Sequence, residues 1–463
     1  MQIKKNEVNK IFIIFLFVHL VVWTLVPSLL NTNLPLDTIE AIAWGNGWPL
    51  GWDKHPPLSA WFPELFYQIF GNQDWAYYFL SQIFVVSSFI IIFIFSKDFF
   101  EDPKYSLISV LLLESILFYN FTTPEFNVNV CPLPFWSLTV YYLWKGLKQD
   151  DIITWLLFGF FAALGFLSKY LFIYLLVAID LFFIYMIIKR NFSYKCLISL
   201  VSFFLVILPH LLWLSDNDYI TIKYGIFRSV DDPLSGFGTH KFLNHLFYPI
   251  IFLVKQIGIL IPFFIMAFFL VSNIKIKLNY KDKKLLFLIS ITILPIILMF
   301  LTSLFGGTRI RTMGLAPFYL FLGVFFVYIF QSKIDLSKLK NFFMIFLFVF
   351  LFSPAVYYLI SVTQTNERTD YPGKKISQIV QERWIHENFS NEIEIVVGYG
   401  WIDGWYAQNL SYHLKQRPKW KSKINEASNK GIVWIKDFNA IKNCEGIFFQ
   451  IEPLNDICMV GKK

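Results

Sequence analysis

The chain has 463 residues and a formal net charge of +8; 56% of its residues are hydrophobic and 16% are charged. Soluble domains carry about 25% charged residues, so this composition excludes an ordinary soluble protein. Much of the positive charge lies in short segments between apolar runs, where Lys and Arg set membrane topology. The charge therefore does not indicate a nucleic-acid partner.

Apolar runs of about 20 residues recur along the chain, which is the length that crosses the hydrocarbon core of a bilayer as a helix. They predict an all-α polytopic membrane protein with about eleven transmembrane helices. The predicted spans are 11–30, 76–96, 105–121, 128–145, 152–168, 170–188, 197–214, 256–272, 285–303, 312–330 and 342–361. The run 152–188 is too long for one span, and Ser168-Lys169-Tyr170 predicts a break within it.

The basic residues alternate between the two sides of these spans. They concentrate in the N-terminal segment and in the connections near 145–148, 189–195, 275–284 and 333–340. Connections rich in Lys and Arg face the cytoplasm. The other set therefore faces the periplasm: the first outer loop 31–75, the short connection 121–127, the outer loop 215–255, the segment 304–311 and the tail from about 362. We expect a multi-pass protein of the bacterial inner membrane with a cytoplasmic N-terminus.

The tail is polar and differs from the rest of the chain. Its strand-like runs are Ile393–Gly398, Gly431–Lys436 and Gly446–Glu452, and an amphipathic helix is expected at Lys375–Phe389. This pattern predicts a small periplasmic α/β domain over residues 362–463, which follows a transmembrane domain over residues 1–361.

The four cysteines fall into two pairs. Cys444 and Cys458 flank the last predicted strand in an oxidising compartment, so they are candidates for a disulfide; two unpaired thiols are the alternative. Cys131 and Cys196 lie in apolar surroundings and are expected to be buried as small hydrophobic residues.

The first outer loop carries ionisable groups next to the bilayer, which is costly and indicates a functional site. Asp37-Thr38-Ile39-Glu40 fits a helix capping box, with Asp37 as the N-cap and Glu40 as its partner. The functional alternative is a carboxylate at the water–membrane boundary that accepts a proton or binds a cation. The two interpretations are compatible, because a cap fixes the position of the carboxylate.

The same loop continues with Lys54-His55-Pro56-Pro57-Leu58. Two prolines stiffen the backbone directly after a Lys and a His. These two side chains suit an anionic lipid headgroup, most obviously a phosphate. The alternative is a snorkelling Lys and a His that only caps the loop.

Two further outer segments carry charge. In the connection Thr122–Asn129, Glu125 is expected at a helix start, where its charge is stabilised by the helix dipole, with Asn127 as a supporting residue; simple N-capping is the alternative. Lys169 lies between two apolar half-runs, where a lone Lys calls for an anionic partner.

The segment Gly306–Arg311 adds Arg309 and Arg311 on a flexible backbone, and Arg pairs well with phosphate. Topological flanking is the alternative. The outer loop 215–255 has no sharp pattern and is expected to cover a substrate. Metal-binding and nucleotide-binding signatures are missing from the sequence, so no cofactor is required and a divalent metal is unsupported.

In the order of these elements the chain resembles the GT-C superfamily of membrane glycosyltransferases, which use polyprenyl-phosphate sugars. It resembles in particular the bacterial relatives of dolichyl-phosphate-mannose–protein mannosyltransferases and of the lipid A aminoarabinose transferase. The matching motifs lie over roughly residues 10–330: Pro35–Ala41, Lys54–Leu58, Pro124–Asn129, Leu167–Tyr170 and the Arg309/Arg311 segment. The aminoarabinose transferases have Glu-Lys where this chain has Lys54-His55, so a metal that depends on that Glu is in doubt here.

The resemblance implies catalytic roles for Asp37 and Glu125, with Glu40 in support. It implies that Lys169, Arg309 and Arg311 face the donor phosphate, to which Lys54 and His55 are assigned from their own chemistry. The implied reaction is inverting sugar transfer from a polyprenyl-phosphate donor to lipid A or lipopolysaccharide, another envelope glycan, or a protein hydroxyl.

Two other classes of function are compatible with many spans and buried charges. A transporter or flippase of a lipid-linked saccharide would show internal repeats and charges at the bilayer midplane. Here the charges lie at one face and no repeat is visible, which favours an enzyme. A structural scaffold would leave Lys169 and the acidic loops unexplained.

Overall fold

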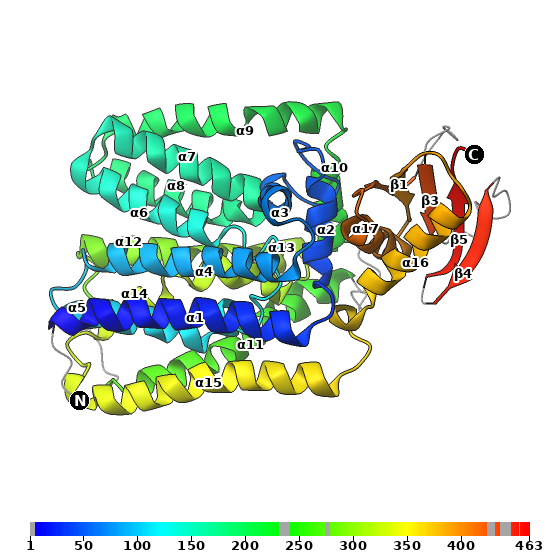
Figure 1. The fold of residues 1–463 in the computed structure, drawn as a ribbon. Helices are drawn as coiled ribbons and strands as arrows, with labels where there is room; N and C mark the ends of the chain where they lie inside the picture. The colour runs from blue at the N-terminus through cyan, green and yellow to red at the C-terminus, as the bar shows by residue number, and fades with distance from the viewer. Residues whose placement is uncertain (1–4, 231–240, 274–277, 424–430, 436–445, 453) are drawn as a thin grey trace. The chain divides into compact units, whose positions relative to one another are not determined.

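The computed structural model describes residues 5–230, 241–273, 278–423, 431–435, 446–452 and 454–463. The chain forms two compact units (Figure 1). The first comprises Met1–Val26, Leu50–Ser59 and Ser81–Leu359, and the second comprises Pro27–Pro49, Ala60–Leu80 and Ile360–Lys463.

The first unit is a bundle of helices, many of which run alongside one another in Figure 1. Within it α7 packs against α6 and α9, and α11 packs against α13. The helices that lie in it wholly or in part are α1 Val8–Leu30, α4 Asp74–Ser96, α5 Pro103–Leu111, α6 Leu133–Gln149, α7 Ile152–Ser168, α8 Ile173–Ile188, α9 Ile198–Asp216, α10 Ile220–Val230, α11 Lys241–Phe268, α12 Lys283–Thr292, α13 Leu294–Gly306, α14 Leu322–Phe330 and α15 Leu339–Thr363. Short 3-10 helices connect some of them, among them η2 Leu112–Ser115, η4 Tyr170–Phe172, η5 Tyr194–Leu197 and η7 Thr312–Tyr319.

The helices of this unit make the chain a multi-pass membrane protein. Among the described residues, seven helices are long and apolar enough to cross a bilayer, or eight if the bent pair Thr312–Tyr319 and Leu322–Phe330 is one span. The predicted number of about eleven is not confirmed. The runs predicted at 128–145 and 152–168 form helices of 17 residues each. The predicted break at Lys169 is confirmed, because α7 ends at Ser168 and Lys169 has extended backbone.

The span predicted at 105–121 is wrong, because α5 ends at Leu111 and the chain continues in 3-10 turns. Polar groups explain this break. Glu114 is fully buried with its carboxylate 3.0 Å from Nδ1 of His19, which is also fully buried. The side-chain amide of Asn120 donates to the Glu114 carbonyl, so side-chain bonds here satisfy backbone groups that a continuous helix would pair internally.

The predicted outer loop 215–255 is also largely helical. It contains α10 and the first half of α11, and its residues 231–240 lie outside the described residues. Helix α11 begins at Lys241 because Leu243, Phe247 and Ile250 recur at helical spacing and extend the apolar pattern of the predicted span 256–272.

The second unit is built around a five-stranded sheet with strand order β2-β1-β3-β5-β4. The strands are β1 Ile393–Val397, β2 Lys419–Lys421, β3 Gly431–Ile435, β4 Ile447–Ile451 and β5 Asn455–Val460. Strand β1 runs parallel to β2 and β3, whereas β5 runs antiparallel to β3 and β4. The register places Val396 opposite Val433, and Val433 opposite Met459. The three strands predicted from the sequence are confirmed, and β2 and β5 are additional.

Four helices accompany this sheet: α2 Leu36–Gly45, α3 Leu58–Phe70, α16 Gly373–His386 and α17 Asp403–His413. Helix α16 confirms the amphipathic helix predicted at Lys375–Phe389, with each end within three residues. A single core includes Val396 and Val433 from the sheet, Leu410 from α17, and Ile39 and Ile42 from α2. Helix α2, which carries Asp37, therefore belongs to the same folded unit as the tail.

The burial of Cys131 and Cys196 in the structure agrees with the prediction from the sequence. Cys131 is fully buried and Cys196 nearly so, as predicted. Cys458 is buried on β5. Cys444 lies outside the described residues, so the disulfide stays a prediction.

Candidate active site

Asp37 lies in the first turn of α2 and not at its N-cap. The helix begins at Leu36, and the N-cap position is Pro35, which makes no side-chain cap bond. Proline fixes its own backbone angle in a range that suits a helix start, and the Pro35 carbonyl already accepts a bond of 3.1 Å from the Ile39 amide. The predicted Asp37–Glu40 capping box is therefore wrong. The carboxylate of Asp37 is still favoured here by the positive end of the helix dipole.

Asp37 and Glu40 lie on the same side of α2, because residues three apart on a helix are neighbours. Both side chains are partly exposed, while Thr38, Ile39 and Ala41 between and after them are buried. The helix thus buries its apolar side in the second unit and presents two carboxylates on the other side.

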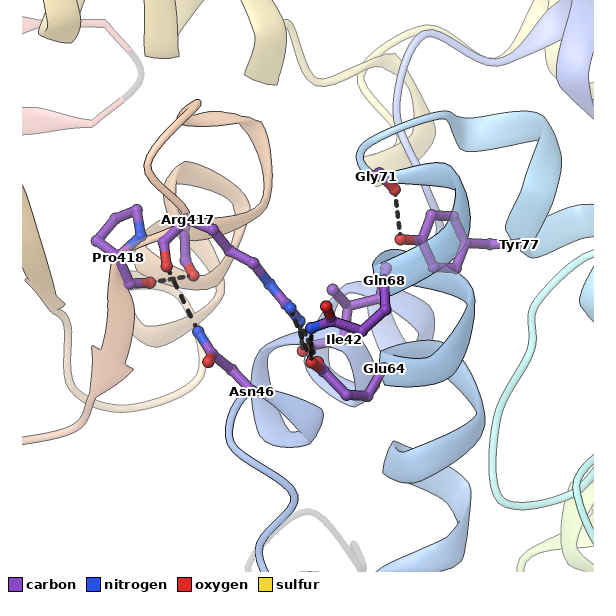
Figure 2. A network of polar contacts seen from close by, with 9 residues as sticks. Ile42, Asn46, Glu64, Gln68, Gly71, Tyr77, Arg417 and Pro418 are labelled. Carbon is purple, nitrogen blue, oxygen red and sulfur yellow. Dashed lines mark hydrogen bonds and ion pairs between the residues drawn. The ribbon is translucent and has the colours of Figure 1, made fainter.

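Arg417, which lies four residues after the end of α17, links α2 to α3. Its guanidinium pairs with both carboxylate oxygens of Glu64, with one N–O distance of 3.0 Å, and also donates to the Ile42 carbonyl at 3.2 Å. It stacks 3.6 Å from the ring centre of Tyr67. Figure 2 shows Arg417 reaching between the helices toward Glu64 and Ile42.

The packing of α2 against α3 is tight at one glycine. A Cβ atom on Gly45 would lie 2.5 Å from the Ala60 carbonyl oxygen and 2.8 Å from Cβ of Glu64. Gln68 donates to Glu64 at 2.7 Å, so the buried carboxylate has partners besides Arg417. These contacts fix the orientation of the helix that carries Asp37.

In the first unit, the segment that carries Lys54 and His55 is held by α9 and α10. The Leu50 carbonyl accepts a bond of 2.7 Å from Nδ1 of His210, and the Trp52 carbonyl accepts one from the Thr221 hydroxyl. The Trp52 amide donates to the His55 carbonyl at 3.1 Å, which closes a turn before Pro56. The two side chains predicted to bind phosphate therefore project from an anchored turn.

His55 is neutral at physiological pH. Desolvation, followed by the charges of Lys169 and Lys54, lowers the pKa of His55 from 6.5 to about 3. The low pKa favours the neutral imidazole over the cation, and the predicted role of His55 in phosphate binding stays a prediction. A neutral imidazole still supplies one N–H donor. The same electrostatic coupling brings Lys54, His55 and Lys169 into one cluster.

Glu125 lies in a turn and not at the start of a helix as predicted, because α6 begins only at Leu133. The Asn127 side-chain amide donates to Glu125 at 3.3 Å, and the Asn127 side-chain oxygen accepts from the Asn129 amide at 2.8 Å. Lys169 donates to the side-chain oxygen of Asn129 at 2.5 Å. A continuous polar chain thus connects Glu125 to Lys169.

The turn that carries Glu125 is anchored on α4. Ser81 and Gln82 both donate to the Thr123 carbonyl. Phe126 is fully buried against Phe84, with ring centres 5.2 Å apart. Because the residues on either side of Glu125 are fixed, its carboxylate has a defined position without a helix.

The segment of Arg309 and Arg311 joins α13 to η7, and both Arg side chains are exposed. Gly307 makes the turn in a left-handed conformation with φ of 60°, which glycine adopts without strain. Gly314 follows Arg311 closely, and a Cβ atom there would lie 3.4 Å from Nζ of Lys169. The backbone that follows the two Arg residues therefore runs beside Lys169.

The first unit thus brings together Lys54, His55, Lys169, Glu125 and Asn127, with the Arg segment adjacent through Gly314. Asp37 and Glu40 lie in the second unit. The sequence did not identify the bridging role of Asn129, although the Asn-x-Asn repeat after Glu125 was visible. It also gave no sign of the close approach at Gly314. Among the described residues, no three His, Cys, Asp or Glu side chains are grouped so that they could hold a metal ion.

Part of the chain matches a known protein family. Residues 54–213 match the family model of dolichyl-phosphate-mannose-protein mannosyltransferases. The match includes His55, Glu125 and Lys169. No curated protein sequence matches the chain.

Solved structures share the fold over almost the whole chain. ArnT from Cupriavidus metallidurans bound to undecaprenyl phosphate has a TM-score of 0.54 and 13% identity, over 97% of this chain and 99% of that one. The same protein in the apo state has a TM-score of 0.53 and 11% identity, over 98% of this chain and 99% of that one. The archaeal oligosaccharyltransferase AglB from Archaeoglobus fulgidus was solved in complex with an inhibitory peptide and a dolichol-phosphate. Its TM-score is 0.44 at 10% identity, over 97% of this chain and 74% of that one, and this score is too low to assign a fold. The fold expected from the resemblance, a helical membrane bundle with a small C-terminal α/β domain, is confirmed.

Proposed function

We propose that this GT-C protein transfers a sugar, a hexose or a pentose, from a polyprenyl-phosphate donor to an acceptor of the bacterial envelope. The acceptor is lipid A or lipopolysaccharide, another envelope glycan, or a protein hydroxyl. The observation that carries the proposal is the cluster of Lys54, His55 and Lys169, which a polar chain connects to Glu125. This cluster falls within the residues that match the mannosyltransferase family model.

The donor phosphate binds to the cations of this cluster. Lys169 and Lys54 supply positive charge, and His55 donates one N–H bond in its neutral form. Arg309 and Arg311 lie on the segment next to Lys169 and pair with the same phosphate, since guanidinium groups bind phosphate oxygens with two parallel hydrogen bonds. That ArnT was solved with undecaprenyl phosphate supports a ligand of this chemical class for the shared fold.

The reaction is an inverting displacement at C1 of the sugar. An oxygen of the acceptor forms the new bond to C1 while the bond from C1 to the phosphate oxygen breaks, so polyprenyl phosphate leaves with the electron pair. The cations stabilise the charge that grows on the leaving phosphate, which is often the largest catalytic contribution. Where the acceptor is a hydroxyl, its proton passes to a carboxylate acting as general base, a role worth about 10²–10⁴-fold.

We assign the general base to Asp37 and a second catalytic role to Glu125, following the positions of the acids in the GT-C family. Asp37 is partly exposed on a helix whose orientation Arg417 and Glu64 fix. Glu125 has a fixed position because Asn127 donates to it. Where the acceptor is a phosphate, no base is needed and Asp37 orients the acceptor.

The protein acts at the inner membrane, with its N-terminus in the cytoplasm and its C-terminal α/β domain in the periplasm. The distribution of Lys and Arg among the connections supports this orientation. Donor and acceptor therefore meet on the periplasmic face. The sugar arrives on a lipid carrier, so no nucleotide site is required.

Mass spectrometry of envelope lipids and glycans from cells with and without the gene tests the proposal. Loss of the protein should remove one sugar from a single acceptor and leave its polyprenyl-phosphate donor in excess. An intact set of acceptors would contradict sugar transfer by this chain. The gene carrying Asp37→Asn should fail to restore the missing sugar.

A further inference from the structure

A pocket of about 880 Å³ opens in the first unit where α6, α8 and η5 meet the start of α12. It lies far from the Lys169 cluster. Cys196 in its lining lies two residues before α9 begins, whereas His210, which holds the Leu50 carbonyl, is 14 residues further on. At 1.5 Å per helical residue these positions are about 20 Å apart. The pocket is therefore distinct from the candidate active site.

The lining of the pocket is strongly basic. Its cations are Lys148, Lys189, Arg190, Lys281 and Lys283. Asp150, which also lines the pocket, is paired with Lys195 at 3.2 Å and accepts from the Trp155 ring nitrogen at 3.0 Å. Lys148 is paired with Asp98 at 3.1 Å. In the described part of the chain, the other four cations form no ion pair with a carboxylate.

Exposed apolar side chains adjoin the lining residues Lys189 and Ser193 in the chain. Ile188 at the end of α8 is 72% exposed, and Tyr194 at the start of η5 is 75% exposed. Phe183, Tyr185 and Phe192 in the lining continue this apolar strip between the cations. Aromatic and apolar side chains beside Lys and Arg at the end of a spanning helix are typical of the interface between hydrocarbon and headgroups.

We propose that this pocket binds the phosphate headgroup of an anionic phospholipid, with the acyl chains along the exposed apolar side of α8 and η5. Its unpaired positive charge suits a phosphate. The exposed side chains of Ile188 and Tyr194, each next to a lining residue in the chain, favour a lipid over a soluble phosphate, because a lipid can cover apolar surface while its headgroup binds Lys189. Basic pockets between transmembrane helices bind anionic headgroups for the same reason.

The test is native mass spectrometry of the purified full-length protein with phosphatidylglycerol or phosphatidylcholine. The wild type should retain phosphatidylglycerol in preference. The double variant Lys189→Gln/Lys281→Gln should bind it about 25-fold less tightly, from about fivefold for each cation removed. The matched control Lys338→Gln/Lys340→Gln removes two basic residues outside the pocket lining and should bind as the wild type does.

Three results would overturn the proposal. They are equal retention by the pocket variant and the wild type, an equal loss in the pocket variant and the control, and displacement of the lipid by glycerol phosphate at similar concentration. The variant Lys189→Arg/Lys281→Arg keeps the charge and should keep the lipid. A loss of lipid in this variant despite a normal unfolding temperature would also contradict a headgroup site.

Discussion

Arg417 and Glu64 form an ion pair through both carboxylate oxygens inside the second unit, where Glu64 is 1% and Arg417 is 11% exposed. These residues are separated by 353 positions in the chain. The pair joins the tail to α3, and the additional bond from Arg417 to the Ile42 carbonyl extends it to α2. The helix that carries Asp37 is thus stabilised by a residue of the C-terminal domain.

Loss of either partner of this pair should destabilise the protein strongly. Glu64→Met or Arg417→Met leaves one buried charge without its partner, which costs about 3–5 kcal/mol. The double variant Glu64→Met/Arg417→Met removes both charges and should recover most of this loss. A double-mutant cycle on the unfolding of the purified protein in detergent measures the coupling. Single variants as stable as the wild type would show that the pair contributes nothing.

Glu125→Gln should lower the rate of sugar transfer severely, because the amide cannot take the role of a carboxylate. Asn127→Ala should lower the rate less, since it removes a bond to Glu125 and the cap on the Asn129 amide but keeps the acid. Initial rates at saturating donor distinguish the two effects. An Asn127→Ala enzyme slower than Glu125→Gln would show that Asn127 does more than hold Glu125.

Lys169→Ala should weaken donor binding more than folding. The ammonium group donates to Asn129 and lies next to His55, so its removal takes away charge that we assign to the donor phosphate. We expect KM for the donor to rise about tenfold or more, in line with the strength of a charge-assisted hydrogen bond. Lys97→Ala, a Lys that stacks on Phe93 in the first unit, is the control. The same donor affinity in all three proteins would exclude Lys169 from the phosphate site.

His55 should make the protein less stable as the pH falls. Its pKa is about 3 in the folded protein, against 6.5 for an unperturbed histidine, so the unfolded chain takes up a proton that the folded chain does not. Stability from this group is complete above about pH 6.5 and is lost below it. Between pH 7 and 5, His55→Gln should lose less stability than the wild type, by about 2 kcal/mol. Unfolding curves with the same pH dependence in both proteins would mean that His55 is not held neutral.

The parts of the fold that depend on local pattern could be predicted from the sequence. Most long apolar runs became helices, the break at Lys169 fell where predicted, and three strands and α16 matched, because apolar length and periodicity are properties of neighbouring residues. Strand β2 is only Lys419–Lys421 and has no apolar alternation, so its sequence carries no strand signal.

Contacts between distant segments could not be predicted. The capping pattern of the sequence predicted Asp37 as the N-cap of α2. The helix instead starts at Leu36, and the Ile39 amide donates to the Pro35 carbonyl. The pairing of Arg417 with Glu64 arises only when α17 packs beside α2 in the folded unit. The low pKa of His55 comes mainly from burial and from the charge of Lys169, which lies 114 residues further along the chain. Such effects require the three-dimensional fold.

The central claim is that Asp37 serves sugar transfer from a polyprenyl-phosphate donor. Its most direct test is a transfer assay with purified wild-type protein and Asp37→Asn, a labelled polyprenyl-phosphate sugar and extracted envelope acceptor. We predict that the wild type labels the acceptor and releases polyprenyl phosphate, and that Asp37→Asn is slower by about 10²–10⁴-fold with a hydroxyl acceptor and an unchanged unfolding temperature. Labelling of a hydroxyl acceptor at the wild-type rate by Asp37→Asn would contradict the account.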